Sequence, residues 1–512
     1  MNKLHTYLYL ILLVIVICNT MSAQVGFIER YSYKGNWPTL FVNAINDTDT
    51  TVIVYGKTIN PENSQNGIYV ARIDTLGKVI QESFFVDEDE YIPDNGYHII
   101  KTDDEGYMMV ASTFYNNSAL LLKINKELEI VWNKKYELNR NKYTTIWCKN
   151  ILKSYDSYML LTIKGKTDGK LITSILKVNQ SGELIWEKDY GTLGNDEVGY
   201  FSPSSTDDEI IIYGARQHNF YSASGSSWGM IYAIDTSGTV IWEHEDEPIG
   251  NQQYEPYEYV IRDDEGGWVV SQPKIHRPVK NSESTWSEQS RIRKLDDDFN
   301  VVWSLNLENY LGYDLYKNIT AISTLESSDI IISGNTPTAV FPGVDGLSVS
   351  ELAKINSGGN LKWMRYDTLF YGLDKSVLIE NNKHIILPSG SIMLCGTITT
   401  NSGEYYGFIE KLDKDGCLKP GCRDTLPTED LPDGKEVLLY PNPATHEISI
   451  RGKLDSGSEF MIYDRLGRLY LAQEAFDGMK IDVSSWPSGM YFYSLIIDNE
   501  KSQIIGKIII VK

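Results

Sequence analysis

The chain has 512 residues, of which 12% are aromatic and 40 are glycine, and its formal net charge at pH 7 is -22. This length allows more than one hydrophobic core, and so strong a negative charge repels phosphate backbones, which excludes nucleic acid from the expected partners. Glycine and aromatic residues are abundant and helical apolar periods are few, so we expect an all-β fold.

The first element along the chain is an export signal. Residues 1–23 contain Lys3, an apolar run from Leu8 to Cys18 and a small-residue end at Ser22 and Ala23, the order typical of a signal peptide cut before Gln24. A membrane anchor is the competing interpretation, but the run is shorter than the ~20 apolar residues that a spanning helix needs. We therefore expect a mature chain without a transmembrane segment.

Residues 24–422 contain a sevenfold repeat. In each unit a strand-like segment ends at Asp or Asn and a short turn leads into a second segment, as in IYAIDTSGTVIWEHEDE from Ile231 to Glu247. Two further strand-like segments precede that pair, so each unit supplies four short strands. The residues that open the turns lie 51 to 61 positions apart and are Asp74, Asn125, Asn179, Asp235, Asp296, Asn356 and Asp413.

Repeats of this length form architectures in which each unit buries its faces against its neighbours. Four antiparallel strands per unit predict a blade, and seven blades predict a seven-bladed β-propeller. A β-helix has shorter repeats, and separate sandwiches need ~100 residues each. We expect the Asp or Asn to hydrogen-bond its own turn. Five units carry a Trp seven residues later, which we expect to wedge between adjacent blades: Trp132, Trp186, Trp242, Trp303 and Trp363.

The seventh unit has no fourth strand after GFIEKLDKDG, whereas residues 25–33 form an unassigned strand-like segment. An open ring would leave unpaired backbone groups at its edge, so we predict that residues 25–33 supply the missing strand and close the ring. Cys417 and Cys422 flank a Pro-Gly turn and are near enough for a local disulfide. Cys148 and Cys395 lie in apolar strands, as buried free thiols do.

The repeat resembles two known groups. IYAIDTSGTVIWEHEDE resembles the pyrroloquinoline-quinone-type propeller repeat, and GNDEVGY followed by EIIIYGAR resembles the seven-bladed propeller repeats of exported bacterial proteins. Quinoprotein dehydrogenases, which carry the first of these repeats, have a vicinal cysteine pair near their cofactor. This sequence has no two adjacent cysteines. We therefore expect no organic cofactor. Acidic segments such as VDEDEYIPDNG could hold calcium, although their spacing matches no defined calcium loop.

Residues 423–436, RDTLPTEDLPDGKE, form a linker rich in Pro and acidic residues. Beyond it, residues 437–512 alternate apolar segments with Pro- and Gly-bearing turns, which predicts a small Ig-like β-sandwich. The segment carries a set of spaced motif residues: Tyr440, Pro441, Asn442, Pro443, Gly467, Asp482, Gly489, Tyr491 and Lys512. In these residues it resembles the type A C-terminal sorting domain of the type IX secretion system. The resemblance implies secretion or display on the cell surface, with the type IX machinery as a partner.

The sequence has neither a metalloprotease H-E-x-x-H motif nor a phosphate-binding loop. Long connections follow the second strands of units four to six, and in a propeller they share one face with the connections between blades. We therefore predict a non-enzymatic secreted or cell-surface propeller that binds a glycan or a protein. The alternative is an exported polysaccharide hydrolase or lyase with carboxylates on the channel face. The candidate ligand contacts on these connections are Tyr221, Trp228, Tyr254, Tyr257, His276, Trp286 and Phe341.

Overall fold

The computed structural model divides the chain into two compact units, residues 1–422 and 423–512. Among the residues that the structure describes there is no α-helix, and thus none long and apolar enough to cross a membrane. The predicted signal peptide and the linker lie outside the described residues. The structure describes residues 26–86, 91–92, 99–113, 118–191, 196–202, 204–218, 226–247, 253–276, 287–307, 318–336, 349–367, 377–400, 402–418, 437–440, 444–452, 454, 458–464, 469–487, 489–497 and 502–510.

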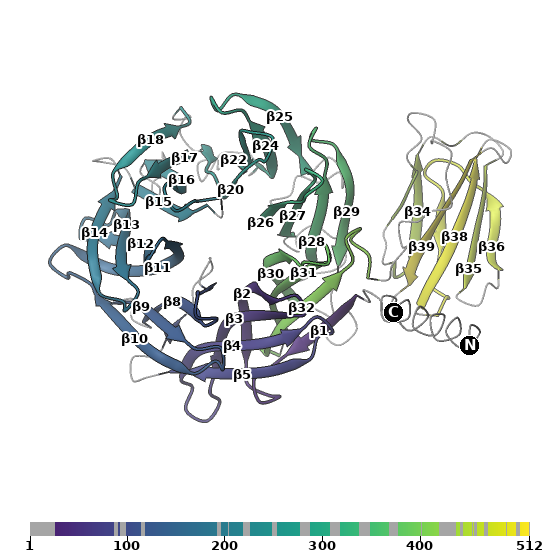
Figure 1. Ribbon diagram of the computed structural model, residues 1–512. Helices are drawn as coiled ribbons and strands as arrows, with labels where there is room; N and C mark the ends of the chain where they lie inside the picture. Colours follow the sequence, from purple (N-terminus) through teal and green to yellow (C-terminus); the bar gives the residue numbers. More distant parts are fainter. Residues whose placement is uncertain are drawn as a thin grey trace, which may run out of the picture. The chain divides into compact units, whose positions relative to one another are not determined.

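The first unit is a ring of seven antiparallel sheets, each with four main strands, which confirms the predicted seven-bladed β-propeller (Figure 1). The innermost strands of blades 1 to 7 are β2 (Thr39–Thr48), β7 (Ile99–Lys101), β11 (Tyr143–Ser154), β15 (Asp196–Phe201), β20 (Tyr259–Arg262), β26 (Asn318–Thr324) and β30 (Val377–Ile386). The second strands are β3 (Thr51–Ile59), β8 (Tyr107–Thr113), β12 (Ser157–Lys166), β16 (Ile210–His218), β21 (Trp268–Ser271), β27 (Ile330–Thr336) and β31 (Ile392–Thr400).

The third and outermost strands follow the same order around the ring. The third strands are β4 (Asn66–Asp74), β9 (Ser118–Ile124), β13 (Leu171–Asn179), β17 (Ser226–Ile234), β24 (Arg291–Leu295), β28 (Val349–Ile355) and β32 (Tyr405–Leu412). The outermost strands are β5 (Val79–Phe85), β10 (Ile130–Glu137), β14 (Leu184–Tyr190), β18 (Val240–Glu245), β25 (Val301–Asn306), β29 (Leu361–Asp367) and β1 (Phe27–Tyr31).

Two blades carry additional short strands. In blade 2, β6 (Tyr91–Ile92) pairs with β8. In blade 4, β19 (Gln253–Glu255) pairs in parallel with β17, and the hairpin of β22 (Lys274–His276) and β23 (Ser287–Gln289) extends the sheet through β19. This hairpin belongs in sequence to blade 5, so it ties two neighbouring blades together.

The turn that follows the third strand is the same in all seven blades, including blade 7, whose outermost strand β1 comes from the N-terminal end. The side-chain oxygen of the turn-opening Asp or Asn accepts a hydrogen bond from the backbone N–H four residues later, at 2.8 to 2.9 Å in each blade. The predicted turn chemistry is therefore confirmed. In blade 3, Gly182 completes the turn at a φ of 77°, a conformation that glycine adopts without steric cost.

The predicted role of the tryptophans is also confirmed, because each packs against the next blade. A Cβ on the turn glycine of that blade would lie only 2.6 to 2.9 Å from the indole, so glycine is needed for the ring to approach. Trp242 differs because its neighbour is Phe299, whose ring centroid lies 5.9 Å away. The other pairs are Trp132 with Gly182, Trp186 with Gly238, Trp303 with Gly359 and Trp363 with Gly416.

The N-terminal strand closes the ring, as the sequence predicted. Strand β1 pairs antiparallel with β32, from Phe27 opposite Lys411 to Tyr31 opposite Gly407. Phe27 covers Gly77 of blade 1, and the Tyr31 hydroxyl donates a 2.8 Å hydrogen bond to the Gly77 carbonyl. Trp132 and Tyr136 have the same four-residue spacing and contact Gly182 in the same way. The closing strand thus repeats the contact that joins the other blades.

The second unit consists of two sheets around one hydrophobic core, which fits the predicted sandwich. Ile448 and Ile481 come from the three-stranded sheet, and Phe460, Leu495 and Ile508 come from the four-stranded sheet. The three-stranded sheet has the order β33 (Val437–Tyr440), β34 (Glu447–Gly452) and β37 (Lys480–Asp482). The four-stranded sheet has the order β36 (Leu469–Glu474), β35 (Glu459–Asp464), β38 (Gly489–Ile497) and β39 (Ser502–Ile510).

The contact between blades 4 and 5 makes a direct test of the wedge. Trp242 packs against Trp268 and Phe299, and its indole N–H donates a 2.6 Å hydrogen bond to Glu209. We expect Trp242→Ala to lower the free energy of unfolding by about 3 to 5 kcal/mol, measured by urea denaturation of the full chain. Ile241→Ala is the matched control, because Ile241 is 54% exposed. Equal stability of the two variants would contradict the wedge.

Candidate functional site

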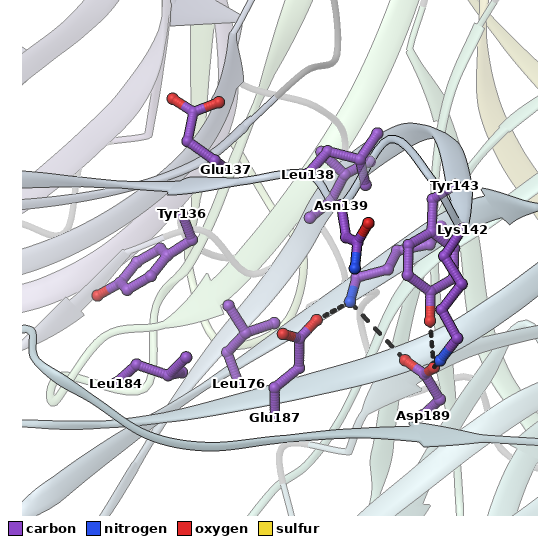
Figure 2. A pocket seen from close by; sticks show the side chains of 12 residues that line it. Tyr136, Glu137, Leu138, Asn139, Lys142, Tyr143, Leu176, Leu184, Glu187 and Asp189 are labelled. Carbon is purple, nitrogen blue, oxygen red and sulfur yellow. Dashed lines mark hydrogen bonds and ion pairs between the residues drawn. The ribbon is translucent and has the colours of Figure 1, made fainter.

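A cleft of about 430 Å³ lies between blades 2 and 3 (Figure 2). A second hollow of about 320 Å³ adjoins it and shares Lys142, Tyr143 and Asp189 with it. The cleft opens on the face where the blade-to-blade connections run, since residues 138–142 connect β10 to β11. Its lining residues are Tyr136, Glu137, Leu138, Asn139, Lys142, Tyr143, Ile146, Lys164, Leu176, Leu184, Glu187 and Asp189.

One end of the cleft is charged. The side chain of Lys164 is only 3% exposed and forms ion pairs with Glu187 and with Asp189, the latter at 3.7 Å. The Tyr143 hydroxyl donates a hydrogen bond to Asp189, and the Lys142 ammonium lies 3.4 Å from the same carboxylate. The Lys164 ammonium also lies 4.8 Å from the centroid of the Tyr143 ring. These contacts hold two carboxylates and two lysines in fixed positions.

Burial sets the protonation of this group. Burial lowers the pKa of Lys164 to about 8, although the Asp189 charge opposes that shift. Burial alone would raise the pKa of Asp189, but the hydrogen bond from Tyr143 and the charge of Lys164 lower it below its usual value. At neutral pH the cleft therefore presents a charged aspartate beside a protonated lysine.

The other end of the cleft is apolar. Leu138 and Leu176 are buried, whereas Leu184 is 49% exposed. Tyr136 lies on the same side as Leu184 in Figure 2, and its hydroxyl donates a 2.8 Å hydrogen bond to the Gly182 carbonyl. A ligand in the cleft would meet an apolar wall and a charged wall together.

The corresponding position in blade 4 explains why the cleft is open in blade 3. Lys164 pairs across the sheet with Ile172, and Arg216 pairs in the same way with Trp228. Arg216 binds Glu243 and Glu245, which stand one and three residues after Trp242, as Glu187 and Asp189 do after Trp186. Because lysine and isoleucine replace arginine and tryptophan, blade 3 has less side-chain volume here than blade 4.

The structure brings four of the seven predicted ligand contacts together beside blade 4. Trp228 lies within β17 and is 4% exposed, so its placement in a loop by sequence was wrong. Tyr257 is 2% exposed, and its hydroxyl donates a 2.9 Å hydrogen bond to Asp246. Tyr254 lies in β19 opposite Ile275 of β22, the strand that ends at His276. Tyr221, Trp286 and Phe341 lie outside the described residues, and ligand contact by any of the seven stays a prediction.

None of the cleft residues was predicted from sequence. The available signal was the acidic residues one and three positions after the tryptophan, in WEKD and WEHE. These acidic residues resemble ordinary solvated charges until the register places a buried cation beside them. Only the pairing of β12, β13 and β14 shows that Lys164 meets Glu187 and Asp189.

Metal and nucleophile chemistry find little support among the described residues. They contain no group of three or more His, Cys, Asp and Glu side chains able to hold a metal ion, and most of the acidic segment considered for calcium lies outside them. The sequence contains one G-x-S-x-G match, residues 225–229. Its Ser227 is 2% exposed within β17 and does not stand on the strand-to-helix turn of a nucleophile elbow.

The cysteines fall into two groups. Cys148 and Cys395 are buried thiols outside any disulfide, as their apolar surroundings in sequence indicated. Cys417 is disulfide-bonded. Its predicted partner Cys422 lies outside the described residues, so this pairing stays a prediction.

The predicted sorting residues are partly described. Asp482 accepts hydrogen bonds from the backbone N–H and the hydroxyl of Ser484. Tyr491 is 3% exposed, and its ring centroid lies 5.2 Å from that of Trp486. Tyr440 ends β33 and Gly489 begins β38. Residues outside the described ranges are Pro441, Asn442, Pro443, Gly467 and Lys512.

Comparison with known families identifies the tail. Residues 438–511 match the family described as the secretion system C-terminal sorting domain. The chain therefore carries the sorting tail of the type IX secretion system, which directs it to secretion or attachment at the cell surface. No curated protein matches the chain.

The chain is similar to several solved structures. One is a protein of unknown function from Bacteroides caccae, with 13% identity, a TM-score of 0.32 and coverage of 67% of this chain and 98% of that one. Another is the β-propeller domain of the Trilobed protease from Pyrococcus furiosus, with 11% identity, a TM-score of 0.38 and coverage of 74% of this chain and 95% of that one. A third is PorZ, a surface component of the type IX secretion system of Porphyromonas gingivalis, with 10% identity, a TM-score of 0.26 and coverage of 91% of this chain and 69% of that one. Likenesses of this degree say nothing about function.

The buried lysine of the cleft predicts a dependence of stability on pH. The folded chain releases the Lys164 proton near pH 8, whereas an unfolded chain holds it to about pH 10.4. Between these values the unfolded state binds more protons, so this group makes stability rise with pH. As the pH rises from 8 to 10, we expect the free energy of unfolding of the unsubstituted chain to increase relative to that of the Lys164→Met variant, both measured by urea denaturation. Parallel pH profiles would contradict this assignment.

Proposed function

We propose that the propeller is a non-enzymatic binding module that the sorting tail carries out of the cell, and that it binds a glycan in the cleft between blades 2 and 3. The observation that carries this proposal is the cleft itself, with Tyr136 and Leu184 at one end and Lys164, Glu187 and Asp189 at the other. A sugar ring has the matching chemistry, because it presents apolar C–H faces and hydroxyl groups together.

The size of the cleft supports a glycan over a protein ligand. Sites for small ligands measure about 300 to 1,000 Å³, and this cleft has about 430 Å³. A stable protein partner would bury about 800 Å² on each side, for which a narrow cleft is not needed. Glu187 and Asp189 can accept hydrogen bonds from hydroxyl groups while both carboxylates stay paired with Lys164.

Protonation supports binding over catalysis. Glycosidases need a carboxylic acid whose raised pKa lets it donate a proton to the leaving group. The pKa of Asp189 is instead lowered. Glu197 does have a pKa raised by burial, but it is 1% exposed and does not line the cleft. Hydrolysis or lyase chemistry on a polysaccharide is the alternative that the experiment must exclude.

The test compares two substitutions at the same position of neighbouring blades. Leu184 and Val240 each begin an outer strand, are 49% and 44% exposed, and stand two residues before the tryptophan, but only Leu184 lines the cleft. We expect the full chain to bind defined members of a glycan array, and Leu184→Lys to weaken that binding at least tenfold by blocking the apolar end. Val240→Lys is expected to bind normally.

Three outcomes would contradict the proposal. Absence of binding to every glycan would refute a glycan as the ligand. Equal binding by the two lysine variants would refute the cleft as the binding site. Release of shorter saccharides from a bound polysaccharide, followed by chromatography, would show an enzyme instead of a binding module.

A further inference from the structure

A cluster of aromatic side chains occupies the junction between blades 7 and 1. The connection from β1 to β2 folds into a small hairpin, with an isolated bridge between Tyr33 and Trp37. The backbone N–H of Trp37 donates a 3.0 Å hydrogen bond to the backbone carbonyl of Tyr33. Lys34 and Gly35 turn the chain between them, with φ of 51° and 80°. The hairpin therefore holds Tyr33 and Trp37 side by side on the same face of the propeller as the cleft.

Phe84 of blade 1 completes the cluster. The ring centroids of Tyr33 and Trp37 are 5.1 Å apart, and those of Trp37 and Phe84 are 5.3 Å apart, with interplanar angles of 80° and 84°. All three side chains are partly exposed. The Lys34 ammonium lies 4.9 Å from the centroid of the Trp37 ring and 5.4 Å from that of Tyr33. One face of the indole is therefore reached by an exposed lysine side chain.

The cluster stands at the position of the repeat that forms the cleft in blade 3. Gln81 takes the place of the tryptophan in blade 1, so Glu82 and Phe84 correspond to Glu187 and Asp189. Phe84 rests on Gly67, where a Cβ would overlap its ring. Glu82 accepts a 3.0 Å hydrogen bond from the Tyr69 hydroxyl. The Tyr69 ring that bears this hydroxyl has its centroid 5.7 Å from that of Tyr33, so the Glu82 carboxylate lies beside the cluster.

The geometry selects one class of ligand. An aromatic cage for a cation holds the ammonium group beside its rings, but here the Lys34 ammonium already takes that position, 4.9 Å from the centroid of Trp37 and 5.4 Å from that of Tyr33, so a second ammonium group would meet a like charge. What they offer is a flat indole face with a carboxylate nearby. A pyranose with equatorial hydroxyls fits this arrangement, because its axial C–H groups form a flat apolar face and its hydroxyls point to the rim.

We propose that Tyr33, Trp37 and Phe84 form a second glycan subsite, in which a β-1,4-linked pyranose stacks on the Trp37 indole in the place of the Lys34 ammonium and donates a hydroxyl hydrogen bond to Glu82. This inference rests on the proposed glycan-binding function and adds a site two junctions away from the cleft. The subsite needs a closed ring, since its hairpin follows the closing strand β1.

The experiment is calorimetric titration of the full chain with cellohexaose and with chitohexaose. We expect one of the two to bind, Trp37→Ala to weaken that binding at least tenfold, and Trp37→Tyr to retain most of it. Lys34→Ala is expected to strengthen binding about two- to fivefold, since the sugar no longer displaces an exposed cation–π contact. Melting temperatures of all variants check that the hairpin change leaves the propeller folded.

The same titrations separate this inference from the proposed function. If Leu184→Lys abolishes binding and a folded Trp37→Ala variant binds normally, the cleft stands and the subsite is refuted. Loss of binding in Trp37→Ala alone would support the subsite and refute the cleft. If neither hexasaccharide binds, the subsite is refuted, whatever the glycan array shows for the cleft. Weaker binding by Lys34→Ala would refute displacement of the lysine.

Discussion

The fold depends on one contact, that of an outermost strand with the turn that follows the third strand of the next blade. Trp186 covers Gly238, Trp363 covers Gly416, and Phe27 of the closing strand covers Gly77. Among the described residues, seven hydrophobic cores follow from this arrangement, one at each junction, and each draws on two blades, whereas a smaller cluster lies within blade 7. A single blade therefore buries neither of its faces alone, and the ring is complete only when β1 pairs with β32, almost the full length of the propeller away in sequence.

This constraint also determines where the molecule can vary. The tryptophan and the turn glycine are fixed by packing, whereas the residues one and three positions after the tryptophan face the end of the second strand. In blade 3 these residues hold Lys164 beside an open cleft, in blade 4 they hold Arg216 beside Trp228, and in blade 1 they contribute to an aromatic cluster. One position of the repeat thus provides three chemically different junctions on a common face.

The sequence predicted what is local or repeated. Seven copies of an Asp or Asn turn and five spaced tryptophans were sufficient for the ring, and an incomplete last unit indicated the closing strand. The candidate sites depend on register between strands, which spacing does not specify. Lys164 meets Glu187 only across β13, and the aromatic cluster joins Trp37 to Phe84 of another strand. Trp228 was assigned to the long connection after the second strand of unit four, but it lies within β17.

Hydrogen exchange of the full chain tests the central claim most directly, because it reports whether β1 belongs to the ring or only rests on it. If the closing strand completes the last blade, the amides of β1 and β32 are protected to the same degree and exchange together with the neighbouring junctions in one cooperative opening. Amides of β1 that exchange orders of magnitude faster, while those of β32 and β2 stay protected, would show that the ring is stable without its closing strand and would contradict this account.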